Sequence, residues 1–409
     1  MIDLAWIEAA LVSARPQALG ALVRYFRDVE VAEEAFQEAS LRALKTWPDN
    51  GPPRSPAAWL IMVGRNSALD VARRHRKQGP MPEGELIDAA SETELADRLD
   101  DAHYRDDVLR LLFICCHPDL PVTQQVALAL RIVSGLSIAQ IARAFLVNET
   151  AMEQRITRAK QRIARADVPF EAPDAFERAE RLAAVAAMIY LIFNEGYSTG
   201  REDDDRAQLC DEAIRLGRLL MSLFAGEPEL MGLTALMLLQ HARSAARFDD
   251  GGNLVLLDSQ DRSRWDRKLI GEGLAMLDKA IRHRQPGPYQ VQAAIAALHA
   301  RAETAEATDW AQIDLLYANL ERLQPSPVVT LNRAVAVSKV KGAAAALEMI
   351  EALTGKLDGY FHFHGVRGAL LLQLGRRKEA KTSLNRAIAL ANTPAEAAHI
   401  RMHLDQLTK

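Results

Sequence analysis

Residues 136–163 read LSIAQIARAFLVNETAMEQRITRAKQRI and predict two helices joined by a tight turn. The first helix should span residues 137–145 and the second should begin at Asn148. Ser137 and Asn148 suit the N-cap positions because their side chains can accept hydrogen bonds from the free first-turn amides. Apolar residues at helical spacing should hold the helices at a steep angle: Ile138, Ile141, Ala142, Phe145, Val147, Met152 and Ile156. This pattern is typical of a helix-turn-helix unit, whose second helix enters the major groove of DNA.

The second helix concentrates positive charge, although the 409-residue chain has a formal net charge of −4. From Thr150 to Arg165, a single acid, Glu153, stands against five basic residues: Arg155, Arg158, Lys160, Arg162 and Arg165. The side chains able to form hydrogen bonds with base edges are those of Thr150, Glu153, Gln154 and Thr157. Arg158 and Lys160 are better placed to contact the DNA phosphates. The alternative is a solvated amphipathic helix, but the capped turn, apolar contacts and one-sided charge together favour DNA. The candidate DNA-binding residues here are Asn148, Thr150, Glu153, Gln154, Arg155, Arg158 and Lys160.

A second basic segment, SPAAWLIMVGRNSALDVARRHR at residues 55–76, overlaps a Pro-framed loop, NGPPRSPAA. A loop above a helix with aromatic and basic side chains can hold unstacked single-stranded DNA. The candidate residues are Arg54, Trp59, Arg65, Asn66, Arg73 and Arg74. Two alternatives stay open: Trp59 and Trp47 can be core residues, and the arginines can form a solvated face.

The helical period recurs almost throughout the chain, so an all-α fold is predicted. Composition divides the chain into residues 1–77, an acidic linker at 78–107, a helical unit at 108–168 and a larger helical region at 169–409. From residue 83 to residue 107 there are ten acids against Arg98 and Arg105. Proline, glycine and like charge indicate a linker whose later part, from about Glu92, is helical.

The last region contains helix pairs of tetratricopeptide type. Residues 361–394, FHFHGVRGALLLQLGRRKEAKTSLNRAIALANTP, place small and apolar residues at the packing positions of such a repeat. These residues are Gly368, Ala380, Leu384 and Ala387, and a looser earlier unit has Ala334, Ala346 and Ile350. Alanine-rich sequence also produces such matches by chance. Residues 193–205 and 248–266 interrupt the helical period and are expected to be loops.

Other signals exclude several classes of protein. The cysteines, Cys115, Cys116 and Cys210, form no disulfide framework or metal-ligand spacing and suit a reducing cytoplasm. Residues 1–16 show no basic segment before an apolar core, so a secretory signal is not expected there. The longest uncharged apolar run, residues 182–193, is too short for a bilayer, which needs roughly 20 residues. We find no nucleophile–base pair, phosphate-binding glycine loop or zinc spacing. A cytoplasmic, non-enzymatic protein without a cofactor or metal is therefore expected.

In order and spacing, these stretches resemble a bacterial sigma factor of the extracytoplasmic-function (ECF) class. AEEAFQEASLRALKTW, at residues 32–47, resembles the polymerase-binding helix of sigma domain two. Residues 58–76 resemble its strand-opening helix, and residues 136–163 resemble sigma domain four. CCHPDLPVTQQVALALR, YLIFNEGYS, LVLLDSQDRSRWDR and SPVVTLNRAVAV resemble the branch that carries a C-terminal tetratricopeptide-like extension.

The resemblance implies the partners and the roles of particular residues. Core RNA polymerase would be bound through the clamp helices of its largest subunit and through its flap. The residues implied in clamp binding are Glu34, Gln37, Glu38 and Arg42. The loop from Arg54 to Trp59, with Arg65 and Asn66, would melt and read the minus-ten element, where one base is flipped out of the stack. Double-stranded and melted promoter DNA are thus both expected ligands.

One residue departs from the family pattern. Relatives commonly carry a lysine or arginine where this chain has Glu153. A carboxylate there favours a cytosine edge and disfavours phosphate, so an uncommon minus-thirty-five sequence is expected.

Two other functions remain open. One is a one-component helix-turn-helix regulator with a solenoid sensor, which would need no polymerase-binding helix. The other is an interaction scaffold whose basic helices bind RNA or acidic partners without sequence preference. If the chain is a sigma factor, its C-terminal region would regulate it in cis, either through a partner held on the solenoid or by docking on the two sigma domains.

Overall fold

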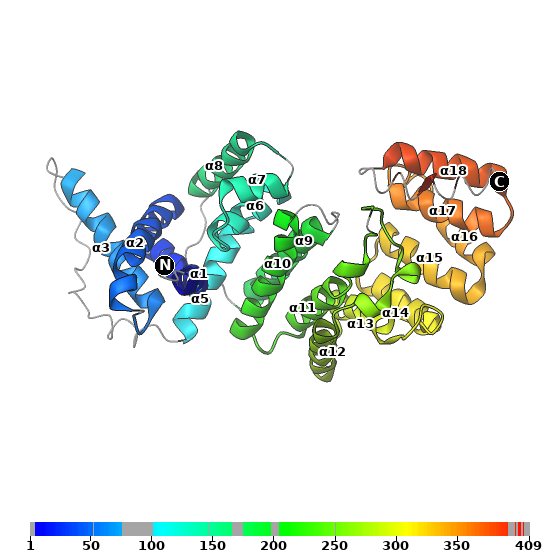
Figure 1. The fold of residues 1–409 in the computed structure, drawn as a ribbon, viewed down its shortest axis with the longest axis horizontal. Coiled ribbons are helices and arrows are strands. Elements are labelled where there is room, and N and C mark those ends of the chain that lie inside the picture. Colours follow the sequence, from blue (N-terminus) through cyan, green and yellow to red (C-terminus); the bar gives the residue numbers. More distant parts are fainter. Residues whose placement is uncertain are drawn as a thin grey trace. The chain divides into compact units, whose positions relative to one another are not determined.

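A computed structural model describes residues 5–51, 53–75, 101–145, 147–165, 175–197, 204–249, 251–391, 397, 400–401 and 404. These residues form α-helices and short 3-10 helices without any strand, which confirms the predicted all-α fold (Figure 1). The chain has two compact units: unit 1 is Met1–Ile192 and unit 2 is Phe193–Lys409.

The helices that begin in unit 1 are α1 (Ala5–Phe26), α2 (Val29–Asn50), α3 (Pro56–His75), α5 (Asp101–Cys115), α6 (Val122–Ile132), α7 (Ile138–Ala144), α8 (Glu149–Arg165) and α9 (Ala175–Tyr197). Helix α5 runs across the expected border at residue 108, and the linker from residue 78 to residue 100 lies outside the described residues.

Helices α1, α2 and α3 pack against one another because α2 buries a stripe of mostly small residues. Helix α2 begins after Asp28, whose carboxylate accepts hydrogen bonds from the first-turn amides at 2.7 and 3.1 Å. Two glycines allow close helix contacts. A Cβ added to Gly64 would lie 2.9 Å from the carbonyl oxygen of Ala35, and one added to Gly20 would lie 2.6 Å from that of Asp107. The second contact brings α5 against α1.

Helices α6, α7 and α8 form the predicted helix-turn-helix unit. Gly135 makes the turn after α6 with a positive φ of 75°. Ser137 caps α7 through a capping box with Gln140. The side-chain oxygen of Asn148 accepts a hydrogen bond from the amide of Ala151 at 2.7 Å, at the start of α8. Both predicted N-caps are confirmed.

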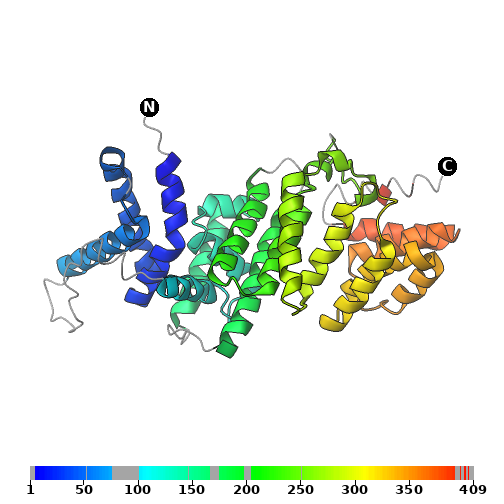
Figure 2. The same cartoon turned by 90° about the horizontal axis from the view of Figure 1, so that it is seen from below.

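Unit 2 continues from the last turn of α9 as a series of helices. They are α10 (Asp204–Leu223), α11 (Pro228–His241), α12 (Arg267–Arg282), α13 (Pro288–Arg301), α14 (Trp310–Leu323), α15 (Pro327–Lys341), α16 (Ala343–Glu351), α17 (Phe361–Gln373) and α18 (Arg377–Leu390). Helix α11 is buried over most of its length because α10, α12 and α13 all pack on it. Successive helices of the unit lie side by side (Figures 1 and 2).

The expected tetratricopeptide-like packing positions are all buried in the pairs α15–α16 and α17–α18. Gly368 shows why a small residue is needed, since an added Cβ would come within 2.6 Å of the Leu384 side chain.

One of the two expected loops is confirmed, and the other is partly helical. Residues 248–266 contain only 3-10 helices, η2 (Leu257–Ser259) and η3 (Arg262–Arg264), and a β-bridge between Phe248 and Leu254. The prediction of a loop from residue 193 was wrong for its first part, because residues 193–197 form the last turn of α9. A glycine in the final turn of a helix costs little, so Gly196 does not end α9 early.

Candidate nucleic-acid interface

Helix α8 separates a buried stripe from a polar face. Its buried residues are Met152, Ile156, Ala159 and Ile163. The expected DNA-reading residues on the solvent side are exposed: Asn148, Thr150, Glu153, Gln154 and Arg158. Arg155 is half-buried at the edge of this face. The helix therefore presents donors and acceptors along its N-terminal half, where a major-groove reader needs them.

Lys160 is engaged by a carboxylate from α2. Its ammonium lies 2.6 Å from Oε2 of Glu33, whose side chain is only 4% exposed. Arg131 at the end of α6 lies 2.9 Å from the other oxygen of Glu33, and Arg15 of α1 lies 3.9 Å from it. Glu33 thus joins α2 to both α1 and the helix-turn-helix unit through three cations. In this arrangement the Lys160 ammonium is held by protein rather than presented for phosphate.

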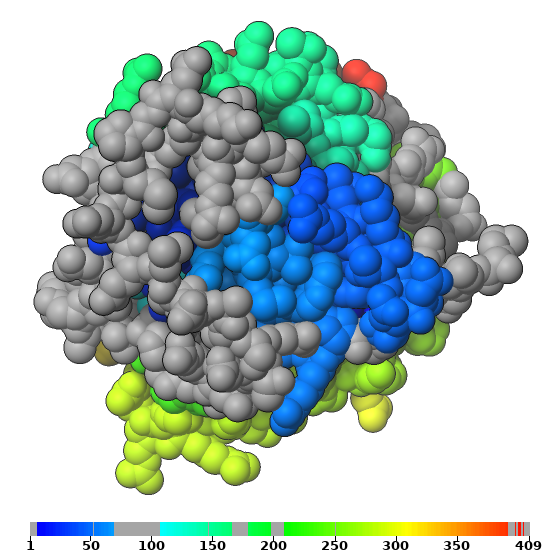
Figure 3. All heavy atoms as spheres, turned by 90° about the vertical axis from the view of Figure 1, so that its left-hand side faces the viewer, coloured from blue at the N-terminus to red at the C-terminus, as the bar shows by residue number. Residues whose placement is uncertain are grey.

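Arg15 strengthens the same junction. Its guanidinium donates hydrogen bonds to the carbonyl oxygens of Ile132 at 2.9 Å and Arg131 at 3.1 Å, so it caps the C-terminal end of α6. Burial lowers the pKa of Arg15 to about 10, and the attraction of Glu33 acts in the opposite direction. Figure 3 shows the green surface of the helix-turn-helix unit next to the darker blue surface of α2.

The outward face of α2 carries the expected polymerase-binding residues. Glu34, Gln37 and Arg42 are exposed, and Glu38 is half-buried with an ion pair of 3.3 Å to Arg42. Sequence reasoning missed three exposed apolar residues of the same helix, Val31, Leu41 and Leu44. They could have been found as apolar residues outside the core stripe of α2. Sequence reasoning also missed Glu33, an acid within the buried stripe of α2.

The expected strand-opening residues divide into two groups. Trp59 is half-buried, with its ring 5.4 Å from that of Trp47, and Trp47 in turn stacks on Trp6. Arg54 and Asn66 are exposed. The structure therefore brings the tryptophans into the apolar core, while the polar residues reach solvent.

Arg65, Arg73 and Arg74 all lie on α3. The Arg65 guanidinium lies 5.4 Å from the centre of the Tyr25 ring. The side chains of Arg73 and Arg74 lie outside the described residues.

All three cysteines are buried. Burial raises the pKa of the Cys116 thiol to about 12, and burial followed by the nearby Asp211 raises that of Cys210 to about 12. Cys116 packs against the sulfur of Met188 at 3.3 Å. Within the described ranges, no cluster of three metal-ligating side chains occurs.

Comparison with known proteins identifies three regions of the chain. Sigma-70 region 2 matches residues 11–78, Sigma-70, region 4 matches residues 110–163, and a family of unknown function, DUF6596, matches residues 181–281. An uncharacterized protein of Rhizobium meliloti (strain 1021) is 67% identical over 410 residues, covering 100% of this chain and 97% of that protein. The ECF RNA polymerase sigma factor BldN of Streptomyces coelicolor is 32% identical over 142 residues, covering 33% of this chain and 50% of that protein. No solved structure matches the chain.

A helix-turn-helix unit that follows a sigma region 2 match defines the class of protein, an RNA polymerase sigma factor. More specifically, the chain belongs to the sigma-70 family as a factor of the ECF type, with a C-terminal extension that includes the DUF6596 region. In the described parts of the chain, no helix is both long and apolar enough to cross a membrane.

Proposed function

We propose that this sigma factor docks on core RNA polymerase through the outward face of α2 and reads the minus-thirty-five element with α8. The loop before α3, with the polar residues of that helix, supports strand opening at the minus-ten element. The observation that carries the proposal is the separation of faces on α2 and α8. Each helix buries an apolar stripe and leaves its polar candidate residues accessible.

The proposed domains follow the division made from the sequence. Residues 1–77 bind polymerase and the minus-ten element, and residues 108–168 bind the minus-thirty-five element. Residues 78–107 connect these two domains. Residues 169–409 regulate the activity of the sigma domains in cis. The matches to Sigma-70 regions 2 and 4 fall within the first and third segments, except that the first match extends one residue into the linker. Regulation in cis is supported by unit 2, which forms a compact helical unit of its own.

The α2 surface holds polar and apolar residues suited to a protein partner. Leu41 is 53% exposed and Leu44 is 44% exposed, close to Gln37 and Glu38. Exposed apolar residues flanked by polar ones are common at protein–protein interfaces. This supports polymerase, rather than DNA, as the partner of α2.

Run-off transcription with purified core polymerase tests the proposal. The variant Gln37→Ala with Glu38→Ala should lose promoter-dependent transcript and affinity for core polymerase. The matched control, Asp49→Ala with Asn50→Ala, changes an exposed acid and amide at the end of the same helix and should retain both. Full transcription by the first variant would show that this face of α2 does not bind core polymerase.

A further inference from the structure

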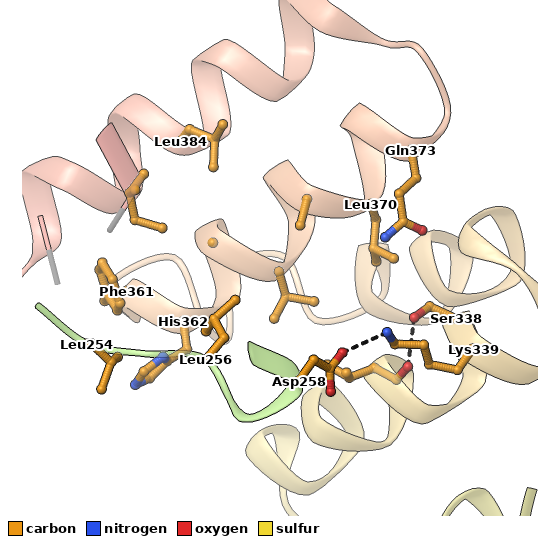
Figure 4. Close-up of a pocket in the computed structure, with 15 residues that line it drawn as sticks. Leu254, Leu256, Asp258, Ser338, Lys339, Phe361, His362, Leu370, Gln373 and Leu384 are labelled. Carbon is orange, nitrogen blue, oxygen red and sulfur yellow. Dashed lines mark hydrogen bonds and ion pairs between the residues drawn. The ribbon is translucent and has the colours of Figure 1, made fainter. Parts of the chain in front are cut away.

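Unit 2 contains a cavity of about 420 Å³ between the segment at residues 254–258 and helices α15, α17 and α18 (Figure 4). Its volume is within the range of pockets that enclose small-molecule ligands. Most of its wall is apolar, with Leu254, Phe361, Leu370 and Leu384 among the lining residues.

One face of α17 forms the floor of the cavity, and its small residues leave the space open. Gly365 and Ala369 lie one helical turn apart and both line the cavity. Among the described residues, a Cβ added to Gly365 would meet the side chain of Ile400 alone, at an ordinary contact distance of 3.6 Å. The small residues Gly365 and Ala369 therefore keep this part of the cavity open.

The opposite wall is held in place by backbone hydrogen bonds. The backbone amide of Val255 donates a hydrogen bond to the carbonyl oxygen of Arg247 at 2.8 Å. The side-chain amide of Gln260 donates to the carbonyl oxygen of Val255 at 3.1 Å. These bonds fix the segment that carries Leu254 and Leu256 into the wall. Leu256 is 45% exposed, which is a cost unless an apolar molecule covers it. The wall is thus formed before any ligand arrives.

Most polar groups lie at one end of the cavity, whereas His362 lies on the other side, near Leu254 (Figure 4). The Lys339 ammonium lies 2.8 Å from Oδ2 of Asp258, and both side chains are partly exposed. Ser338 and Gln373 also line the cavity near this pair (Figure 4). Asp258 and Lys339 form an ion pair whose charges cancel, and His362, the remaining titratable side chain of the described lining, lies away from this pair (Figure 4).

A charge balance of this kind selects against charged ligands. A carboxylate placed beside Lys339 would also meet Asp258, and an ammonium beside Asp258 would meet Lys339. Either would lose its hydration without gaining a net opposite charge. A neutral group that both donates and accepts hydrogen bonds can satisfy Asp258 and Lys339 together.

We propose that this cavity binds one neutral amphipathic small molecule. Its aliphatic body lies against Gly365, Ala369 and Leu256, and its head group, a carboxamide or similar donor–acceptor, contacts the Asp258–Lys339 pair. The inference goes beyond the proposed function, and binding is measurable without polymerase or promoter DNA.

Isothermal titration calorimetry of the full chain with octanamide, octanoate and octylamine at pH 7 tests the assignment. Octanamide should bind saturably at one site. Octanoate and octylammonium have the same chain length and should bind at least about tenfold more weakly, a difference of about 1.4 kcal/mol. Absence of saturable octanamide binding, or tighter binding of octanoate, would overturn the proposal.

Two variants locate the site. Ala369→Phe fills the cavity and should abolish octanamide binding, whereas Ala344→Phe, at an exposed position of α16 outside the lining, should not. Lys339→Met keeps the length of the side chain and leaves Asp258 unbalanced, so octylammonium should then bind more tightly than octanoate. Thermal unfolding of each variant verifies the fold. Wild-type affinity in Ala369→Phe, or an unchanged order of the ligands in Lys339→Met, would refute the site.

Discussion

At the scale of single residues, Glu33 of unit 1 is a buried acid that contacts three cations. Its carboxylate is almost fully buried and depends on Arg15, Arg131 and Lys160 for compensation. A buried charge stabilises a fold only while its partners are present, and loss of one member leaves the others desolvated. The stability of unit 1 therefore depends strongly on this one side chain.

Glu33→Gln should lower the free energy of unfolding of unit 1 by about 3 kcal/mol, because three cations lose their counter-charge. Urea unfolding followed by circular dichroism measures the change. Glu34→Gln makes the same substitution at the next, exposed position of α2 and should shift stability by less than about 0.5 kcal/mol. Equal effects of the two substitutions would contradict the assigned role of Glu33.

Gln154 and Gln161 form a matched pair on α8, both exposed, with Gln154 in the N-terminal half. Gln154→Ala should reduce discrimination at one base pair of the minus-thirty-five element by about 1–3 kcal/mol. Gln161→Ala should leave discrimination unchanged. Competitive run-off transcription on promoters that differ at single positions provides the measurement, and equal behaviour of the two variants would remove Gln154 from the reading face.

At the scale of elements, His299 links α13 to its neighbours. Arg262 of η3 donates hydrogen bonds to the carbonyl oxygens of His299 and Ala302, and the His299 ring lies 5.2 Å from the ring of Trp310 on α14. Burial, followed by the positive charges of Arg243 and Arg262, lowers the pKa of His299 to about 4. The folded unit thus holds this imidazole neutral.

The lowered pKa makes the stability of unit 2 depend on pH. In the unfolded chain His299 becomes protonated below about pH 6.5, whereas in the folded chain it stays neutral down to about pH 4. The free energy of unfolding therefore decreases as the pH falls from 6.5 to 4. Between pH 7 and pH 4.5, His299→Gln should lose about 2.5 kcal/mol less stability than the wild type. His283→Gln, at an exposed histidine, should follow the wild type. Urea unfolding at both pH values measures the difference, and parallel losses in all three proteins would exclude a buried neutral His299.

Elements were predictable wherever their signals are local. The caps of α7 and α8 and the small residues of α17 and α18 lie within a few residues of the structure they determine. The contact of Glu33 with Lys160 joins residues 127 positions apart, and no local pattern indicates it. The cavity in unit 2 was also unpredictable, because residues 254–258 and α17, which both line it, lie far apart in the sequence and no local pattern joins them.

At the scale of the whole molecule, a net charge of −4 does not attract DNA. Affinity for DNA must therefore come from local basic surfaces. Arg158 is exposed on α8, and its side chain donates to the Gln154 carbonyl oxygen at 3.2 Å. Each exposed cation of such a surface that contacts phosphate should make a measurable share of the salt dependence of binding.

Arg158→Ala should reduce the slope of log affinity against log salt concentration by about 1 on random duplex DNA, because one phosphate contact is lost. Arg264→Ala removes an exposed arginine of unit 2 and should leave the slope unchanged. Fluorescence anisotropy over a range of salt concentrations measures both. An unchanged slope for Arg158→Ala would show that its charge does not contact phosphate.

The burial of the cysteines has a practical consequence for solution studies. At neutral pH a thiol with a pKa of about 12, such as Cys116 or Cys210, is almost entirely protonated, and only the thiolate reacts with maleimides. Burial, followed by the neighbouring Cys116, also raises the pKa of Cys115 well above its usual value, so this thiol is protected as well. A single cysteine introduced on an exposed position can therefore carry a fluorophore without removal of the native ones.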